Sequence, residues 1–382
     1  MHRIHQDTIS TSGVVRPTVV EVDLSVLAEN FRAIRRHVTP AKVMPVLKAN
    51  AYGHGLVRVA RLMQDNGADA IGVAVLEEGI LLRENGITLP VLVMGGILGN
   101  QIPHFFKHNL TLTAASIEIL NQVDAIAAGL KIRAKVHLKI DTGMERIGVH
   151  HYNAERFLET ASRCGHVDVE GIFSHFANAD AADLSHARLQ VERFCEVLSY
   201  YKKRGLPYPP LRHMANSGAI LQLPEARFDM VRAGVLLYGV YPTPEANRTI
   251  DVKPALSWKS RVVYFKVIRA GSSVGYGSTW MTDHDVRSVT VPVGYGDGYF
   301  RSMSGKATVL IRGKKYPLVG AISMDQVVVN IESDSAYTND EVVLIGEMNG
   351  ESITCEDLAG WAGTIPYEIL TNINTRVPRI YK

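Results

Sequence analysis

Short apolar segments alternate with amphipathic segments along the first two thirds of the chain. Eight β-rich apolar runs follow one another, at residues 42–49, 69–75, 90–96, 110–116, 135–141, 169–177, 211–217 and 229–235. Segments with apolar residues at helical spacing precede or separate them, at 24–38, 55–67, 153–164 and 187–205. Continuous apolar strands that alternate with helices are typical of an α/β fold, in which helices cover the outer face of a parallel sheet.

The number of these units favours a closed sheet. Eight strand-and-helix units in roughly 220 residues predict a (β/α)8 TIM-type barrel. An open doubly wound sheet is the alternative. A further strand at 18–23 precedes the first unit, and the segment after the seventh run is short enough to leave its helix open.

The pattern changes after Tyr241. Residues 241–254 contain three prolines and no helical period, which is typical of a linker. Alternating β-branched segments separated by turn residues follow, with one short helical segment at 355–363. We therefore expect a flexible N-terminal extension at 1–16, a barrel at 17–245 and a mainly β C-terminal domain at 246–382.

Composition narrows the class of protein but not its chemistry. The 41 Lys and Arg residues against 38 Asp and Glu residues give a net charge of +3, too small to indicate a nucleic-acid partner. No apolar run approaches the ~18 residues that span a membrane, and the N-terminus lacks the apolar region of a secretory signal. Cys164, Cys195 and Cys355 lie far apart, which favours reduced thiols over disulfides or a metal site. We expect a soluble, cytoplasmic, globular protein without a metal.

Chemically capable side chains stand where the barrel strands end, and active sites of such barrels lie at those ends. Lys48 ends the first run, and burial there would lower its pKa and favour a Schiff base. A small hydroxylated turn after the seventh run and a glycine after the eighth suit a phosphate. The strand ends together carry Lys48, Lys139, Asp141, Arg146, Ser174, His175, His213, Asn216, Ser217, Arg232 and Gly234.

A series of motifs in these segments resembles the alanine racemase family. The motifs are VLKANAYGHG, KIDTGMERIG, FSHFANAD, ANSGA, VRAGVLLYG, SVGYGSTW, VGYGDGYFR, SMDQ and TIPYEI with TRVPRIY. They occur in the family's order from about residue 18 to the C-terminus, across both expected domains. The resemblance implies a (β/α)8 barrel followed by a β domain, with pyridoxal 5'-phosphate as the cofactor.

The resemblance also implies a role for each matching residue. Lys48 corresponds to the lysine that binds the cofactor, and Arg232 to the arginine that faces the pyridine nitrogen, with His213 as its partner. Tyr52, Asn216, Ser217, Gly234 and Tyr367 correspond to cofactor-binding positions around the phosphate. His175 stands where the family has a histidine near the cofactor and the catalytic tyrosine.

Racemisation needs a base on each face of the substrate carbon, since a proton leaves one face and another arrives on the opposite face. The resemblance assigns Lys48 to the D-face and Tyr276 to the L-face. Arg146 and His175 would lower the pKa of Tyr276 by favouring its phenolate. Arg146 and Met324 match positions that contact the substrate, here alanine.

In the family the tyrosine comes from the partner subunit, which implies a head-to-tail homodimer with shared active sites. Tyr295 and Arg301 would line the path by which substrate reaches the site. Some members carry a carbamate on the lysine at the position of Lys139, which would orient Arg146. The chain departs from the family pattern at Ala321, where a basic residue is common, and at Gly296, where alanine is common.

The expected activity is interconversion of L- and D-alanine, which provides D-alanine for peptidoglycan. Asp325 in SMDQ favours alanine as the substrate, and a broader amino-acid or serine racemase is the nearest alternative. A non-catalytic pyridoxal phosphate carrier would not need the β domain with Tyr276. A barrel decarboxylase would need a catalytic cysteine, for which Cys355 in a helical segment is a poor candidate.

Overall fold

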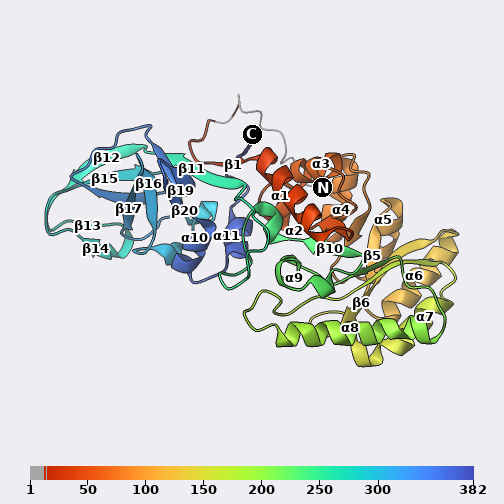
Figure 1. Ribbon diagram of the computed structural model, residues 1–382. Coiled ribbons are helices and arrows are strands. Elements are labelled where there is room, and N and C mark those ends of the chain that lie inside the picture. Colours follow the sequence, from red (N-terminus) through yellow and green to blue (C-terminus); the bar gives the residue numbers. More distant parts are fainter. Residues whose placement is uncertain (1–12, 14) are drawn as a thin grey trace. The chain divides into compact units, whose positions relative to one another are not determined.

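The computed structural model describes residue 13 and residues 15–382, in two compact units (Figure 1). The barrel unit comprises Leu27–Ala51 and Leu56–Lys253. The β unit comprises Pro254–Lys382, Tyr52–Gly55 and the described residues up to Val26. The predicted boundary lies between residues 245 and 246, with residues 17–26 in the barrel, whereas the compact units divide near residue 254 and place those residues in the β unit. Most of the extension predicted to be flexible lies outside the described residues.

Eight parallel strands form the core of the barrel unit. They are β2 (Lys42–Pro45), β3 (Ile71–Val73), β4 (Val91–Val93), β5 (Thr111–Ala114), β6 (Ala134–Asp141), β8 (Val167–Phe173), β9 (Leu211–His213) and β10 (Met230–Ala233). A short strand, β7 (Val149–His150), pairs with β6 outside this series. Neighbours from β3 to β9 pair in parallel, as do β10 and β2. Most of these residues are buried, which explains their continuous apolar runs.

Two further sets of backbone contacts close the barrel. A parallel bridge between Val46 and Gly72 joins β2 to β3. The N–H of Asp229 donates to Arg212 O at 3.0 Å and that of Arg232 to Ala215 O at 2.8 Å, which joins β10 to β9. The closed (β/α)8 barrel is therefore confirmed over the open doubly wound sheet.

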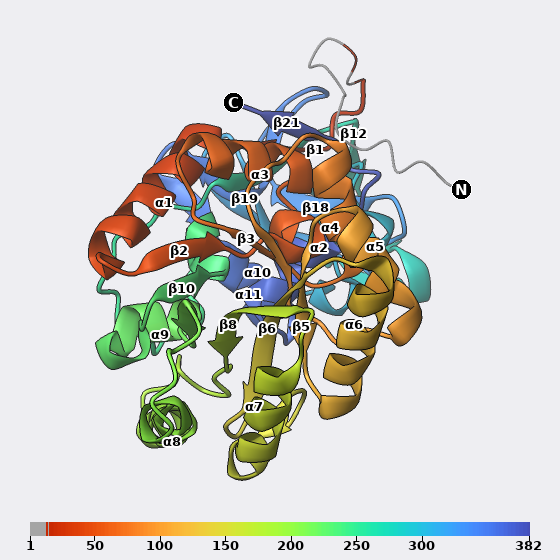
Figure 2. The ribbon, with the colours of Figure 1, turned by 90° about the vertical axis from the view of Figure 1, so that its right-hand side faces the viewer.

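Helices surround the strands of the barrel unit (Figure 2). They are α3 (Leu56–Asp65), α4 (Leu76–Glu84), α5 (Ile102–Lys107), α6 (Ile117–Leu130), α7 (Ala154–Arg163), α8 (Ser185–Lys203), α9 (Ser217–Gln222) and most of α1 (Leu24–Val38). Each longer helix buries an apolar stripe, such as Leu27, Phe31 and Ile34 of α1. The uncertain segment after the seventh run forms the six-residue helix α9 and the 3-10 turn Pro224–Ala226.

The β unit is built on one ten-stranded sheet. Along the sheet the order is β12 (Tyr264–Ile268), β15 (Val286–Val291), β18 (Val327–Glu332), β17 (Lys314–Val319), β16 (Thr308–Ile311), β19 (Glu341–Met348), β11 (Leu256–Arg261), β1 (Val19–Val22) and β21 (Arg379–Tyr381), and β20 (Glu351–Ile353) pairs with β19. The strand predicted at 18–23 is thus β1 of this sheet, antiparallel to β11 and parallel to β21. Buried Trp258 and Tyr299 pack edge to face beneath it, with ring centroids 5.7 Å apart.

Two helices and a small hairpin complete the β unit. The predicted helical segment at 355–363 is α10 (Cys355–Ala362), capped by the Thr354 side chain. The helix α11 (Pro366–Asn372) was not predicted. The hairpin pairs β13 (Ser273–Val274) with β14 (Trp280–Met281), and the loop between them carries Tyr276.

Candidate active site

The lysine predicted to hold the cofactor stands just after the first barrel strand, in the segment α2 (Lys48–Tyr52). Burial lowers the pKa of Lys48 below its ordinary value, and the positive charges of Arg146 and Arg232 lower it further, against an opposing effect of Glu78. A lowered pKa leaves more of the amine uncharged. The uncharged amine is the form that condenses with a carbonyl compound.

The backbone that follows Lys48 forms one left-handed turn. Residues 49–52 have φ angles of 53°, 55°, 52° and 51°, although none of them is glycine. Such a conformation costs roughly 1–2 kcal/mol per residue for residues with a Cβ atom, so side chains must hold it. Asn50 does so from within, because its Oδ1 accepts a hydrogen bond from the N–H of Leu56 at 2.7 Å.

Glu78 holds the same turn from the neighbouring strand-helix connection. Its carboxylate accepts from the N–H of Ala49 at 2.7 Å and from that of Ala74 at 2.9 Å. Glu78 lies in the first turn of α4, where the helix dipole also favours a negative charge. Sequence analysis missed this residue, because an acidic residue in a first helical turn is ordinarily only a cap.

A buried arginine organises the opposite side of the barrel mouth. Arg232 in β10 is 2% exposed, and its Nη2 donates to the carbonyl oxygens of Ser174 at 2.7 Å and Met214 at 2.8 Å. Its Nη1 donates to Nδ1 of His213 at 2.8 Å, and Nη2 also donates to Nδ1 of His175 at 3.2 Å. Burial lowers the pKa of Arg232 to about 9, so the guanidinium remains charged at neutral pH.

Positive charge accumulates in this region. Lys139 in β6 is 4% exposed, and its Nζ lies 4.4 Å from the ring centre of Phe173. Burial, Arg232 and Arg146 hold the pKa of Lys139 well below its ordinary value. Burial and the same cations also hold the pKa of His175 well below its usual range. These residues therefore lie within one electrostatic environment that penalises each additional cation.

The two carboxylates that act on these cations are engaged with backbone amides. Asp141 interacts electrostatically with Lys139, and Glu78 with Lys48. Asp141 accepts from the N–H groups of Gly143 at 2.8 Å and Arg146 at 3.1 Å, which shapes the loop after β6. The cluster thus combines several cationic side chains with an amine of lowered pKa. That donor set fits an anionic aldehyde such as pyridoxal 5'-phosphate.

The turn after β9 supplies groups that suit a phosphate. The Oγ atom of Ser217 accepts from the N–H of Gly234 at 3.1 Å and from that of Leu236 at 3.2 Å. With both lone pairs engaged, the hydroxyl proton is available for donation. Asn216 caps α9 by accepting from the N–H of Ala219 at 3.1 Å. Residues 216, 217 and 234 are therefore neighbours where the turn after β9 meets the end of β10.

The two tyrosines expected near the phosphate meet in the β unit. The rings of Tyr52 and Tyr367 have centroids 6.1 Å apart. Burial raises the pKa of Tyr52, so this phenol stays protonated and able to donate. The chain passes closely here, because a Cβ atom added at Gly53 would lie 2.3 Å from the carbonyl oxygen of Leu370 in α11. Glycine is needed at this position.

Tyr276, the expected second base, is 73% exposed in the β unit. Its 3-10 turn (Tyr276–Ser278) begins after Gly275, whose φ is 73°. A Cβ atom added at Gly275 would lie 3.3 Å from the backbone nitrogen of Ala321. The turn that carries Tyr276 therefore packs against the segment in which the chain departs from the family pattern.

Met324 and Tyr295 belong to two loops that are hydrogen-bonded to each other. The N–H of Tyr295 donates to Ser323 O at 3.0 Å, and that of Gly296 donates to Met324 O at 2.9 Å. Met324 is 51% exposed and Tyr295 is 43% exposed. Both side chains are therefore exposed on the surface of the β unit. Arg301, predicted on the access path, is exposed in the following 3-10 turn (Arg301–Met303).

An ion-pair network that sequence analysis missed holds these loops. Asp297 is fully buried; its Oδ1 accepts a hydrogen bond from Nε of Arg376 at 2.6 Å and forms an ion pair with Nη2 of Arg16 at 2.7 Å. Arg376 also pairs with Asp325 at 2.6 Å. A Cβ atom added at Gly296 would lie 3.0 Å from Nη1 of Arg376, so the glycine leaves room for this network. Arg16, assigned to the flexible extension, is anchored in it.

The predicted residues therefore fall into separate groups. The barrel unit brings together Lys48, Lys139, Arg146, His175, His213 and Arg232, and it joins Asn216 and Ser217 to Gly234 at the turn after β9. The β unit joins Tyr52 to Tyr367 and the Tyr295 loop to the Met324 loop. Tyr276 and Arg301 occupy two further turns of the β unit.

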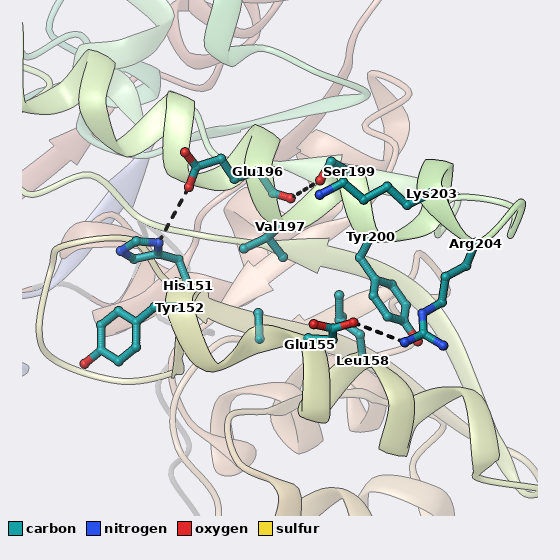
Figure 3. A pocket seen from close by; sticks show the side chains of 11 residues that line it. His151, Tyr152, Glu155, Leu158, Glu196, Val197, Ser199, Tyr200, Lys203 and Arg204 are labelled. Carbon is teal, nitrogen blue, oxygen red and sulfur yellow. Dashed lines mark hydrogen bonds and ion pairs between the residues drawn. The ribbon is translucent and has the colours of Figure 1, made fainter.

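A concavity of the barrel unit lies apart from the predicted active-site residues (Figure 3). It has a volume of about 210 Å³ and lies between α7 and α8. Its charged groups largely pair with one another, as Arg204 does with Glu155 at 3.1 Å and His151 with Glu196 at 4.0 Å. None of the residues predicted for the active site lines it. Its internally balanced charge gives no reason to expect an ionic ligand.

Among residues 13 and 15–382, no helix is both long and apolar enough to cross a membrane. The same part of the chain contains no group of three or more His, Cys, Asp or Glu side chains placed to hold a metal ion.

Comparison with known proteins gives a consistent result over the whole chain. Residues 22–242 match the family model described as the alanine racemase N-terminal domain, and residues 255–381 match the alanine racemase C-terminal domain. The chain is 44% identical to alanine racemase 2 of Caldanaerobacter subterraneus subsp. tengcongensis, over 96% of this chain and 95% of that protein.

Solved structures agree with the family models. The alanine racemase structure from D-cycloserine-producing Streptomyces lavendulae has a TM-score of 0.91 at 36% identity, covering 97% of this chain and 98% of that chain. A histidine racemase from Leuconostoc mesenteroides subsp. sake has a TM-score of 0.87 at 29% identity, covering 96% and 98%. The same scaffold is therefore found in proteins named for different amino acids.

The barrel with its half-buried Lys48 and buried Arg232, followed by the β unit, defines a racemase that depends on pyridoxal 5'-phosphate. Within this class, the chain belongs to the alanine racemase family.

Proposed function

We propose that this chain interconverts L- and D-alanine. The observation that carries the proposal is the cluster around Lys48 and Arg232 in a chain that belongs to the alanine racemase family. The cluster offers an amine of lowered pKa among cations, as an anionic cofactor and an amino-acid carboxylate require. Lys48 would hold pyridoxal 5'-phosphate, with Ser217, Asn216 and Gly234 at its phosphate.

Two side chains of this sequence would move protons. When bound, the cofactor stabilises the negative charge that develops on the substrate carbon. Lys48 would exchange the proton on the D-face, because its lowered pKa makes the neutral amine available as a base. Tyr276 would exchange the proton on the L-face, and its high exposure in its own unit leaves its hydroxyl accessible.

The arginine tunes this chemistry. Arg232 would donate to the ring nitrogen of the cofactor, and its guanidinium retains its proton near neutral pH. That nitrogen would then stay unprotonated, which weakens the stabilisation of negative charge on the ring. Weaker stabilisation disfavours transamination relative to return of the proton.

The site is proposed to be shared between two subunits. Tyr276, Met324 and Tyr295 expose large apolar surfaces on the β unit, as residues that complete a site on another chain would. We infer a head-to-tail homodimer in which Tyr276, Tyr295 and Met324 reach the barrel of the partner, and in which Tyr295 and Arg301 line the path of the substrate. Met324 and Arg146 would contact alanine there.

Lys139 is proposed to carry a carbamate. The lowered pKa of Lys139 leaves more of its amine neutral, and the neutral amine is the form that reacts with carbon dioxide. The carbamate would place a negative charge close to Arg232 and Arg146, and it would orient Arg146 toward the substrate carboxylate. His175 and His213 position the guanidinium of Arg232 on the same side.

The biological setting follows from the reaction. D-Alanine made by this chain would serve peptidoglycan synthesis. We infer a cytoplasmic location, and the free thiols of Cys164, Cys195 and Cys355 are consistent with a reducing compartment.

The direct test follows the circular dichroism of L-alanine incubated with the purified protein and pyridoxal 5'-phosphate, with carbon dioxide measured in parallel. We expect the signal to decay to zero without release of carbon dioxide. Parallel incubations with L-serine and L-histidine measure the breadth of specificity. A signal that persists for alanine but decays for either of the others would overturn the assignment to alanine and favour a racemase of different specificity.

A further inference from the structure

A third histidine lies behind the pair formed by Arg232 and His213. Nδ1 of His137 in β6 is 2.9 Å from Nε2 of His213, and Nδ1 of His213 is 2.8 Å from Nη1 of Arg232. His137 is 3% exposed, and His213 is fully buried. The three side chains thus form a continuous buried chain of hydrogen bonds across the barrel interior.

The donor and the acceptor of each hydrogen bond in this series follow from the chemistry of the arginine. A guanidinium can only donate, so Nδ1 of His213 must be its acceptor and carry no proton. Neutral His213 therefore carries its proton on Nε2 and donates it to His137. Nδ1 of His137 is consequently the acceptor that ends the chain, with the proton of His137 on Nε2.

Both rings remain neutral over the working pH range. Burial, together with the nearby charge of Arg232, lowers the pKa of His137 to about 3. Burial, Arg232, His137 and Lys139 hold the pKa of His213 well below its usual range. A cationic His213 would have protons on both nitrogens and could not accept from Arg232.

The strand register explains how His137 reaches His213 across an intervening strand. His137 of β6 is aligned with Gly171 of β8, next to an irregularity in the pairing after Val136. A Cβ atom added at Gly171 would lie 2.6 Å from Cε1 and 2.7 Å from Nδ1 of His137. The ring of His137 therefore occupies the space that a side chain at residue 171 would fill.

Phe173 fixes the plane of the His213 ring but not its proton. The two rings are stacked, with centroids 4.8 Å apart and planes inclined by 2°. Stacking leaves either tautomer of His213 possible, because both have the same shape. Two contacts select the tautomer protonated on Nε2: the donor Arg232 at Nδ1 and an acceptor, Nδ1 of His137, at Nε2.

We propose that His137 is a positioning residue that stabilises the Nε2-protonated tautomer of His213, by accepting its proton in a hydrogen bond, and thereby holds Arg232 in its place. The role in turnover rests on the proposed racemase function, whereas the role in selecting the tautomer does not. His137 acts only through His213, and it is distinct from the residues assigned above to the cofactor and the substrate.

Two substitutions of matched shape test the proposal. His137→Asn retains an oxygen acceptor near the position of Nδ1, whereas His137→Leu has the same branching without the acceptor. In the holoenzyme we expect His137→Leu to lower kcat for alanine about tenfold or more, with a smaller change in KM, because Arg232 loses its fixed partner. His137→Asn should restore most of the loss.

Nitrogen NMR of protein with ¹⁵N-labelled histidine rings reads the tautomer directly. The His213 signals can be assigned by their absence from His213→Asn. The wild type and His137→Asn should show a protonated Nε2 and an unprotonated Nδ1, and His137→Leu should lose this single pattern. The visible absorption of the bound cofactor should change in His137→Leu alone.

The outcomes separate the two proposals. If the protein does not racemise alanine, the NMR comparison still decides the role of His137. A wild-type His213 pattern in His137→Leu would overturn the inference. Equal impairment of kcat in the Asn and Leu variants would also overturn it, since shape rather than the acceptor would then matter.

Discussion

At the scale of single residues, the geometry of one guanidinium accounts for much of the site. Arg232 donates to three carbonyl oxygens and two imidazole nitrogens, and all five acceptors lie in the barrel interior or at its mouth. The planar guanidinium of arginine can donate to several fixed acceptors at once, whereas the ammonium group of lysine cannot match the same geometry. The requirement at position 232 is therefore for this shape as well as for positive charge.

The first prediction tests this requirement with Arg232→Lys, which keeps the charge. We expect the free energy of unfolding to fall by about 1–3 kcal/mol for each buried carbonyl left without a donor, at Ser174 and Met214. Urea unfolding of the purified variant measures the loss. Arg188→Lys, at an exposed ion pair, is the matched control and should change little. Equal stability of the two variants would show that charge alone suffices at position 232.

At the scale of elements, the left-handed turn at residues 49–52 is the most demanding local structure. It places the residue after Lys48 against Glu78, so the strand end and the start of α4 are joined by a carboxylate. Four consecutive non-glycine residues in this conformation represent a cost of several kcal/mol. The surrounding hydrogen bonds must offset it for Lys48 to stay in place.

The second prediction concerns the hydrogen bonds that the Glu78 carboxylate accepts. Glu78→Met should lower the free energy of unfolding by roughly 1–3 kcal/mol, since the N–H groups of Ala49 and Ala74 lose their acceptor. Occupancy by pyridoxal 5'-phosphate, measured by absorption after dialysis, should fall as well. Glu77→Met changes the exposed neighbour in the same helical turn and serves as the control. Cofactor retention equal to that of the control would contradict the proposed role.

The elements also explain which features the sequence could predict. The eight barrel strands were predictable because burial on both faces produces continuous apolar runs. Helix α11 was missed because seven residues beginning with proline are too few to display a helical period. The turn at residues 49–52 was missed because alanine and tyrosine carry no signal for a left-handed backbone, and the single Asn50 does not indicate four such residues in a row.

Some residues of the site could likewise be predicted from the sequence, and others could not. Lys48 and Arg232 could be identified from their motifs, whereas Glu78 and His137 act through contacts between distant segments. His137 matters because an irregular register places Gly171 beside it. A pairing irregularity of this kind has no signature in one sequence. Asp297 was likewise read as part of a motif, although its burial and its two arginine partners give it a structural role.

At the scale of the whole molecule, neutral histidines inside the barrel link stability to pH. His137 and His213 have lowered pKa values in the folded protein. Their pKa in the unfolded chain is about 6.5. As the pH falls below that value, the unfolded chain takes up protons that the folded protein does not bind. Stability should therefore decrease, by up to about 1.4 kcal/mol per pH unit for each histidine.

The third prediction concerns the proton that His137 takes up on unfolding. Urea unfolding between pH 6 and pH 5 should give a free energy of unfolding that falls with pH in the wild type. The dependence should be weaker in His137→Asn, because that variant has one fewer neutral histidine to protonate on unfolding. The same slope in both proteins would contradict a neutral, buried His137.

The charge of the whole molecule agrees with a small zwitterionic substrate. A net charge of +3 provides little long-range attraction. The cations that matter, at Lys48, Arg146 and Arg232, act on one another inside the barrel unit. The near-neutral composition is therefore compatible with a site whose recognition is local.

The central claim is that Lys48 and Tyr276 serve opposite faces of the substrate carbon. The most direct test measures, by proton NMR in D2O, the loss of the α-proton of each alanine enantiomer with wild-type protein and with Tyr276→Phe. Wild-type protein should exchange both enantiomers. Tyr276→Phe should still exchange D-alanine through Lys48 and should slow exchange of L-alanine by about 10²-fold or more. Equal rates for the two enantiomers in Tyr276→Phe would contradict the two-base account.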